Sequence, residues 1–176
     1  MARSVRTFLP VVGDPASLTR AFEGDPARWL PASRRTGPDE YLVTLRAGAM
    51  SQQVAATIGS PWRSGATRWR SLTWEPTGVD RSPRSVDRLL PSLDGELGLN
   101  IEAHDRVTLI FDGRYEPPGG AVGTAVDVVA LNRVADATIH RLVEDVTARL
   151  SAEATLLGGS AHRSAPRDHG PASIRA

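Results

Sequence analysis

Two stretches in the second half of the chain alternate between apolar and polar residues with a period of two. In the first stretch the apolar residues stand at odd positions: Leu93, Leu97, Leu99 and Ile101. The second stretch keeps the same parity with Val107, Leu109, Phe111 and Tyr115. This period is typical of strands that bury one face and expose the other. The pattern therefore predicts two neighbouring strands of an antiparallel sheet.

The parity of the two stretches also predicts how they pair. Their apolar residues share one face only if the connecting loop holds an odd number of residues or a bulge. A loop over residues 103–105 places Glu102 opposite Arg106 and Asp94 opposite Arg114. Both are favourable cross-strand charge pairs, so we expect this register.

Four further segments have strand character and bring the expected sheet to about six strands. They cover residues 5–12, 40–46, 52–58 and 67–75, and Gly, Pro or Ser residues bound most of them. After the first segment come two Asp-Pro pairs, Asp14-Pro15 and Asp25-Pro26. Asp is a preferred N-cap and Pro is favoured at the first helical position, so two short helices are expected there.

The apolar period changes after residue 118 and predicts one long helix over residues 119–150. One face of this helix carries the apolar residues Ala121, Ala125, Val128, Ala135, Ile139, Leu142, Val146 and Leu150. Beyond residue 151, small and polar residues follow one another without periodicity, which is typical of disorder. We therefore expect one domain over residues 1–151 and a disordered tail over residues 152–176.

Composition and charge narrow the possible classes of protein. The formal net charge is +1, which argues against the basic excess of a nucleic-acid binder. The chain has no Cys, which excludes disulfides and thiolate metal sites and is compatible with a reducing cytoplasm. No apolar run approaches the ~18 residues of a transmembrane helix. The expectation is a cytoplasmic protein.

Three stretches carry a resemblance to a known family. They are Leu72-Thr73-Trp74-Glu75, Leu93-Asp94-Gly95-Glu96-Leu97, and Phe111-Asp112-Gly113-Arg114-Tyr115-Glu116-Pro117-Pro118-Gly119-Gly120 with the later Asn132-Arg133-Val134-Ala135-Asp136-Ala137-Thr138. With the order of the expected elements, they resemble the START-like, or polyketide cyclase/dehydrase-like (SRPBCC), superfamily and an actinobacterial group within it. The likeness covers residues 4–150.

The resemblance implies an α+β helix-grip fold, in which a curved antiparallel sheet wraps around a long C-terminal helix and leaves a cavity between them. Members of the superfamily bind lipids, sterols, polyketides or hormones, and some catalyse cyclisation or dehydration. They share no universal catalytic motif, so no catalytic residue is carried over to this chain. A fold alone does not give a function.

Two polar residues interrupt faces that are otherwise apolar. Asn132 falls on the inward stripe of the long helix, and Arg70 shares its parity with Leu72 and Trp74. A buried amide or guanidinium needs hydrogen-bond partners. One alternative is structural, with Asn132 bonded to a strand and Arg70 snorkelling at the sheet edge. In the other, both residues orient a ligand in a cavity.

The second alternative gives a site hypothesis. The residues expected to line the cavity are Asn132, Arg70, Leu72, Trp74, Leu99, Leu109 and Phe111. The leading function is binding of a small hydrophobic or amphipathic molecule, such as a lipid or a polyketide. An aromatase/cyclase-type enzyme with the same cavity and a non-binding domain with a closed core are the alternatives.

Neither a catalytic group, a metal nor a cofactor is predicted. No spacing of His with carboxylates supplies a zinc site. His140 has Asp136 and Glu144 four residues to either side, which fits an ion-pair ladder on the surface of the helix. Glu96 and Asp112 become neighbours in the expected register, but their parity puts them on the polar side of the sheet. We therefore do not expect acid–base catalysis at this pair.

Overall fold

The computed structural model describes residues 3–47, 50–75, 92–102, 106–116 and 125–163. Its elements, in chain order, are β1 (Arg3–Val11), α1 (Pro15–Glu23), the 3₁₀ turn η1 (Pro26–Arg28), β2 (Arg34–Arg35), β3 (Glu40–Ala47), β4 (Met50–Ile58), β5 (Trp62–Ser64), β6 (Thr67–Glu75), β7 (Ser92–Ile101), β8 (Val107–Glu116) and α2 (Ala125–Arg163).

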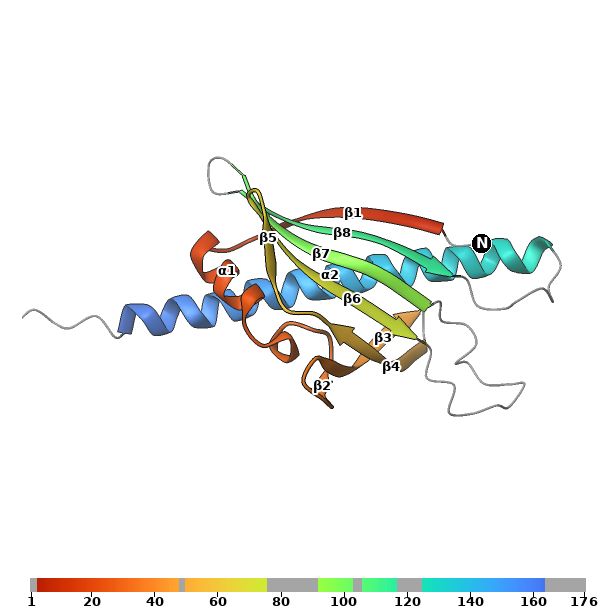
Figure 1. The fold of residues 1–176 in the computed structure, drawn as a ribbon, viewed down its shortest axis with the longest axis horizontal. Coiled ribbons are helices and arrows are strands. Elements are labelled where there is room, and N and C mark those ends of the chain that lie inside the picture. The colour runs from red at the N-terminus through yellow and green to blue at the C-terminus, as the bar shows by residue number, and fades with distance from the viewer. Residues whose placement is uncertain (1–2, 48–49, 76–91, 103–105, 117–124, 164–176) are drawn as a thin grey trace, which may run out of the picture.

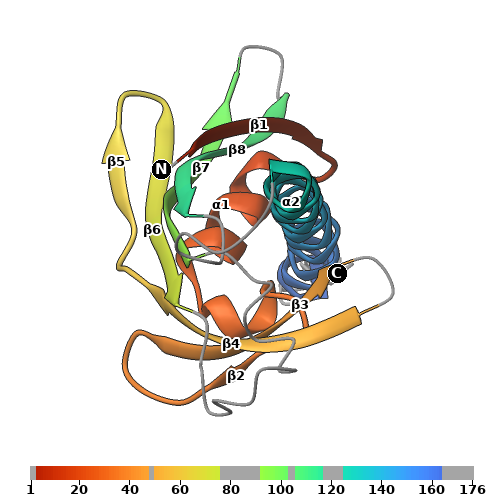
Figure 2. The same cartoon turned by 90° about the vertical axis from the view of Figure 1, so that its right-hand side faces the viewer.

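The strands of the described residues form one antiparallel sheet in the order β1-β8-β7-β6-β4-β3-β2, with β5 paired to β6. Its six long strands are the six that the sequence predicts, and the short strands β2 and β5 are additional. The sheet curves around α2, and its long strands run obliquely across the helix (Figure 1). Seen along the helix, the sheet wraps α2 and encloses α1 (Figure 2). The predicted α+β helix-grip architecture is confirmed.

The register predicted for the β7–β8 hairpin is also confirmed. Asp94 pairs with Arg114, and Glu96 pairs with Asp112. Next to the turn, the Glu102 N–H donates to the carbonyl of Arg106 at 2.8 Å, and the two side chains form an ion pair at 3.8 Å. The predicted loop itself, residues 103–105, lies outside the described residues. The parity of the apolar residues and the cross-strand charge pairs are thus sufficient to predict the register of the two strands.

Both short helices begin at the predicted caps. The Asp14 carboxylate accepts a hydrogen bond from the Ser17 N–H at 2.8 Å, and Pro15 is the first residue of α1. The Asp25 carboxylate likewise accepts from the Ala27 N–H at 3.1 Å. The second helix is a single 3₁₀ turn, which places Trp29 at its C-terminal cap.

The long helix is continuous through position 132, as predicted, but its predicted end at Leu150 is wrong. It has 39 residues in the described part and ends at Arg163. The predicted start over residues 119–124 lies outside the described residues. The expected disorder is therefore wrong for residues 152–163, and residues 164–176 lie outside the described part.

The additional turns of α2 form because they pack on α1 and η1. Ala154 is buried, and an added Cβ on Gly158 would lie 3.5 Å from the Ser17 hydroxyl oxygen. Glu153 is 8% exposed and accepts a hydrogen bond at 2.9 Å from Arg28 of η1. The composition of this segment indicates disorder because Ala, Ser and Gly give a weak apolar stripe. Small residues here instead allow the helices to approach closely.

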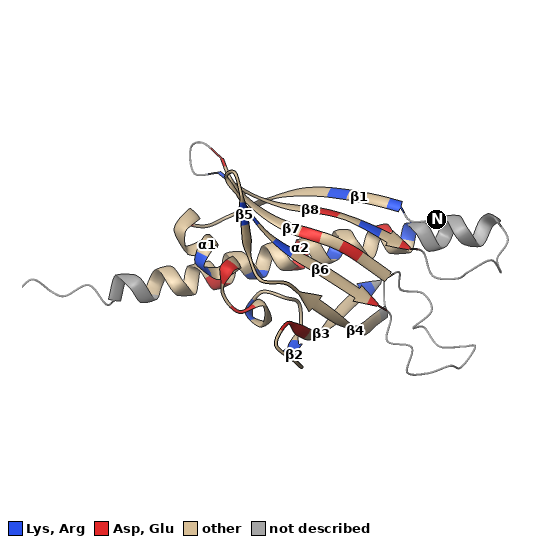
Figure 3. Ribbon diagram, viewed as in Figure 1, with Lys and Arg blue, Asp and Glu red and all other residues tan. Residues whose placement is uncertain are grey.

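The inner face of the sheet, α1 and one side of α2 form a single apolar core. From α2 the core includes Ala135, Ile139, Leu142, Val143, Val146 and Leu150. Acidic and basic residues are interspersed along the strands of the sheet (Figure 3). Within the described residues, no helix has a stretch long and apolar enough to cross a bilayer.

Removing the last turns of α2 tests whether they stabilise the fold. A chain ending at Ser151 should be less stable than a chain ending at Arg163 by about 2 kcal/mol, or roughly 4–8 °C in melting temperature. The reason is that the shorter chain loses the packing of Ala154 and Leu157 and the contact between Arg28 and Glu153. Urea unfolding of the two chains measures the difference, and equal midpoints would contradict the packing role.

Candidate functional site

The apolar residues predicted to line a cavity lie together on the inner face of β6, β7 and β8. Leu99 and Leu109 are direct cross-strand partners. Leu72 and Trp74 come from the neighbouring β6, and all of the predicted apolar lining residues, including Phe111, are at most 3% exposed. Among the described residues of β7 and β8, every inner-face residue is apolar or Gly except Tyr115. The structure therefore brings these side chains to one concave apolar surface.

A pair of glycines shapes the middle of this surface. Gly95 of β7 pairs with Gly113 of β8, and both face inward. A Cβ added to Gly113 would lie only 2.8 Å from Cζ of Phe111, and one added to Gly95 would lie 3.0 Å from the same atom. The Phe111 ring therefore leans over the glycine pair. Larger residues at these two positions would displace the ring toward α2.

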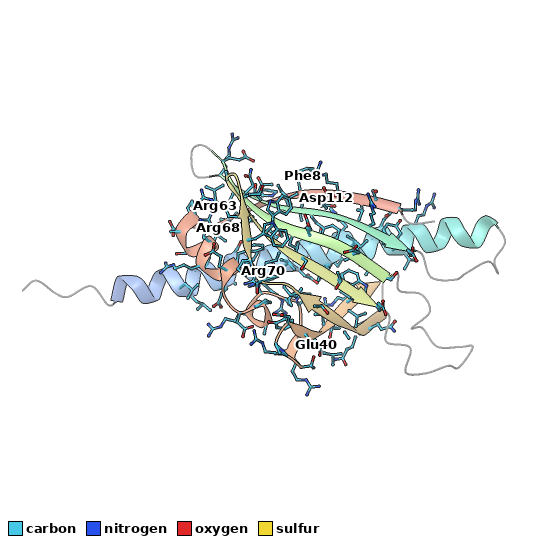
Figure 4. All side chains as sticks on the ribbon, in the orientation of Figure 1. Phe8, Glu40, Arg63, Arg68, Arg70 and Asp112 are labelled. Atoms are coloured by element: carbon cyan, nitrogen blue, oxygen red, sulfur yellow. The ribbon has the colours of Figure 1, made fainter. Side chains whose placement is uncertain are left out.

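Arg70, the predicted polar lining residue of β6, makes structural contacts with the backbone. Its side chain is buried, with the residue 5% exposed, which excludes the snorkelling alternative. Its Nε donates to the Phe22 carbonyl at 2.9 Å and its Nη2 to the carbonyls of Glu23 and Gly24 at 2.7 and 2.9 Å. Nη1 donates to the Gly59 carbonyl at 2.9 Å. Arg70 lies near the junction of α1 and the sheet (Figure 4).

These bonds explain why a cation is tolerated in the core. The last carbonyls of a helix have no partners within the helix and carry its negative dipole, so a guanidinium satisfies both its own donors and those carbonyls. Burial lowers the pKa of Arg70, and the nearby Tyr41 and Glu23 partly oppose this shift. The hydrogen bonds tie α1 to β6 and β4 and leave Arg70 with a structural role.

Tyr115 and Asp136 form a polar contact between the inner face and α2 that the sequence analysis missed. The Tyr115 hydroxyl donates to the Asp136 carboxylate at 2.7 Å, and the ring is almost fully buried. Burial raises the pKa of Tyr115 above its usual 10.0, and the hydrogen bond to Asp136 raises it further. The available signal was the inward parity of Tyr115, since a buried phenol usually has a hydrogen-bond partner.

The side chain of Asn132 lies outside the described residues, although its helix is described through that position. Ala135 and Ile139, which follow it by three and seven residues, are both fully buried. Residues at this spacing share one side of a helix. The inward position of Asn132 and its contact with a ligand stay predictions.

Two pockets lined by described residues bear on the site hypothesis. One, of about 800 Å³, lies toward the ends of β4, β6, β7 and β8. Exposed polar residues such as Thr57, Asp94 and Arg114 line it, together with the inner-face residues Trp74 and Leu93. The other, of about 400 Å³, lies between β1 and α2 and is lined by Leu9, Pro10 and other residues. A cavity between the sheet and α2 stays a prediction, since residues 117–124 and the side chains of residues 125–132 lie outside the described part.

The titratable groups outside the core have ordinary surface contacts. His140 Nε2 lies 3.4 Å from Glu144, as the spacing predicts, whereas Asp136 contacts Tyr115 instead. Glu96 is exposed and Asp112 forms an ion pair with Arg6 at 2.9 Å. Within the described part of the chain, no three His, Cys, Asp or Glu residues come together as metal ligands.

Comparison with known proteins identifies the fold. No protein-family model and no curated protein sequence matches the chain. A STAR-related lipid transfer protein from Xanthomonas axonopodis matches with 12% identity and a TM-score of 0.52, covering 84% of this chain and 85% of that structure. The chain has a START-like helix-grip fold.

Two other solved structures share this fold. Norcoclaurine synthase from Thalictrum flavum, a point mutant bound to a transition-state analogue, matches with 8% identity and a TM-score of 0.52 over 88% of this chain and 97% of that one. A protein of unknown function from Staphylococcus aureus matches with 10% identity and the same TM-score over 89% and 97%. At these sequence identities the structural similarity shows the fold alone. It therefore confirms the START-like resemblance drawn from the sequence only as a likeness of fold.

The structural role of Arg70 predicts a large loss of stability on substitution. Arg70→Met leaves the carbonyls at the end of α1 and that of Gly59 without their donor, and it should cost about 3 kcal/mol or more in urea unfolding. Arg68→Met is the matched control, because Arg68 lies two residues earlier on β6 and forms an exposed ion pair with Glu23 at 2.8 Å. The loss of stability in Arg68→Met should stay below about 1 kcal/mol. Similar losses for both variants would contradict the role given to Arg70.

The raised pKa of Tyr115 predicts a pH dependence of stability. The pKa of Tyr115 is higher in the folded state than in the unfolded state, where it is about 10. This difference stabilises the fold fully below about pH 10, and the stabilisation is lost as the pH rises through the pKa of the folded state. The difference in unfolding free energy between wild type and Tyr115→Phe should thus be constant near pH 7–9 and shrink above about pH 10. Urea unfolding across this range measures it, and a difference that stays constant to pH 11 would contradict the assignment.

Proposed function

We propose that this protein binds a small hydrophobic or amphipathic molecule between the concave face of its sheet and α2. The observation that carries the proposal is the apolar surface formed by Leu72, Trp74, Leu99, Leu109 and Phe111, all on the side of the sheet that faces the helix. Ligand sites of this kind are mostly apolar with a few orienting polar groups. A lipid-transfer protein and a synthase that holds a transition-state analogue have the same fold, which supports the same class of function.

Binding without reaction is the first candidate because no acid, base and nucleophile converge on this surface among the described residues. Tyr115 and Asp136 form a donor–acceptor pair at its border, and the phenol, whose pKa is raised above its usual 10.0, is protonated at neutral pH. To act on a ligand, the phenol would have to move its single donated hydrogen bond from Asp136 to a ligand carbonyl, as an aromatase/cyclase-type reaction would require. That enzyme is the second candidate, and turnover of a bound polyketide-like ketone would favour it.

Native mass spectrometry of freshly purified protein is the direct test of binding. A mass excess that disappears on denaturation would reveal a bound molecule and give its mass. Displacement of the fluorescent probe 1-anilinonaphthalene-8-sulfonate by fatty acids or polycyclic ketones would then define the class. Protein without any mass excess, and without saturable probe binding, would support a closed core instead.

Asn132→Leu tests the proposed polar contact of the ligand with α2. If the side chain meets a polar end of the ligand, the substitution should weaken binding by about 1–3 kcal/mol, the value of one buried hydrogen bond. The melting temperature of the empty protein should stay the same or rise, because a polar group leaves an apolar wall. His140→Leu, at an exposed position of the same helix, is the control and should not change binding.

The outcome for the empty protein separates the two alternatives for Asn132. A clear drop in its melting temperature would show that the amide ties the helix to a strand. The cavity assignment of this residue would then be wrong.

A further inference from the structure

The indole N–H of Trp29 is a buried donor that finds no acceptor in the protein. Trp29 is 0% exposed, and its Nε1 has no hydrogen-bond partner among the described atoms. Most buried polar groups in native proteins are paired, because an unpaired buried donor has lost its bonds to water without replacement. A donor of this kind therefore indicates an acceptor that the chain does not supply.

The acceptors nearest in the chain are already engaged. The Pro26 carbonyl accepts from the backbone N–H groups of Trp29 and Leu30 at 3.2 and 2.8 Å. The carbonyls of the last residues of α1 and of Gly24 accept from Arg70. The Asp25 carboxylate accepts from Ala27 and from Arg35. An indole that turned toward one of these oxygens would therefore have to share an acceptor that is already engaged.

The Trp29 ring is also held firmly in place. It stacks on Phe22 with the ring centroids 5.7 Å apart and an interplanar angle of 18°. The preceding Arg28 fixes η1 to α2 through its contact with Glu153. On the other side, Arg70 fixes the α1 backbone at Phe22. A donor held by rigid neighbours on both sides is preorganised for a partner, since little freedom is lost on binding.

The surroundings of Trp29 define which acceptor fits. Trp29, Phe22, Leu18 and Leu30 belong to the same apolar cluster as the concave surface of the sheet. A carboxylate placed there would lose its hydration without gaining a cation, because Arg70 is engaged with carbonyls. An uncharged carbonyl oxygen has no such cost and accepts one hydrogen bond in a defined direction.

We propose that the indole N–H of Trp29 donates a hydrogen bond to a neutral carbonyl oxygen of the bound molecule, at the end of the interior where α1 and η1 pack against α2. This inference rests on the proposed binding function and deepens it, because it requires a ligand with a ketone, ester or similar group and not a plain hydrocarbon. Figure 2 shows α1 inside the curve of the sheet and beside α2, where it borders the interior.

A pair of isosteric probes tests the proposal on the full-length protein. 2-Acetylnaphthalene carries a carbonyl where 2-ethylnaphthalene carries a methylene group, and the two are otherwise of nearly the same size and shape. One hydrogen bond should make the ketone bind roughly five- to tenfold more tightly. In the ¹H–¹⁵N spectrum of protein with ¹⁵N-labelled tryptophan, the ketone should shift the indole N–H signal of Trp29 downfield. The hydrocarbon should not.

Two variants make the comparison specific. Trp29→Phe keeps an aromatic ring next to Phe22 but removes the donor, so the preference for the ketone should disappear and the Trp29 signal is assigned by its loss. Trp69→Phe is the control, because Trp69 packs over Gly98 on the outer face of the sheet, and the preference should persist. Where Trp29→Phe does not fold, the Trp29 signal is assigned by elimination with single Phe variants of the other three tryptophans, Trp62, Trp69 and Trp74, and its shift in the wild type decides.

Each result supports or overturns the inference. Equal binding of both probes, or a preference that survives in Trp29→Phe, overturns it while the binding function stands. A water contact of the Trp29 N–H that persists in the ketone complex also overturns it, because a resident water would then be the acceptor. Failure of both probes to bind counts against both the inference and the proposed function for ligands of this size.

Discussion

Wrapping a sheet around a single helix is the constraint on which the rest of this structure depends. A helix with its side chains is about 10–12 Å across, so a sheet that buries most of it must curve strongly. The order β1-β8-β7-β6-β4-β3-β2 places the hairpin β7–β8 and β6 at the centre of the curve. The inward glycine pair lies on β7 and β8, where missing side chains leave room for the Phe111 ring between sheet and helix. The concave surface proposed as the ligand site is a direct product of this curvature.

Local patterns in the sequence predicted much of this fold. The alternation in β7 and β8, the charge pair Glu102–Arg106 and the Asp-Pro starts of the short helices all act between residues close in the chain. The same is true of the inward stripe of α2. Interactions of this range can be inferred from spacing alone. The fold comparison agrees with the resemblance drawn from the sequence, although almost no sequence identity remains.

The contacts that sequence reasoning missed join residues far apart in the chain. Arg70 is an anomaly in the sequence, but three of its four partners are backbone carbonyls 46 to 48 residues earlier, which leave no trace in residue identity. The end of α2 was misplaced because its stability comes from α1, through Gly158 beside Ser17, and not from its own composition. Nothing in the sequence singles out Trp29, and its unpaired donor appears only once the described structure shows which acceptors surround it.

The choice of partners for Arg70 has a consequence for how this protein responds to acid. An ion pair between a guanidinium and a carboxylate weakens when the carboxylate takes up a proton. The carbonyl oxygens that accept from Arg70 do not titrate in this range, and a guanidinium remains charged throughout. The fastening of α1 to β6 therefore does not depend on the charge of any carboxylate, and it persists as pH falls.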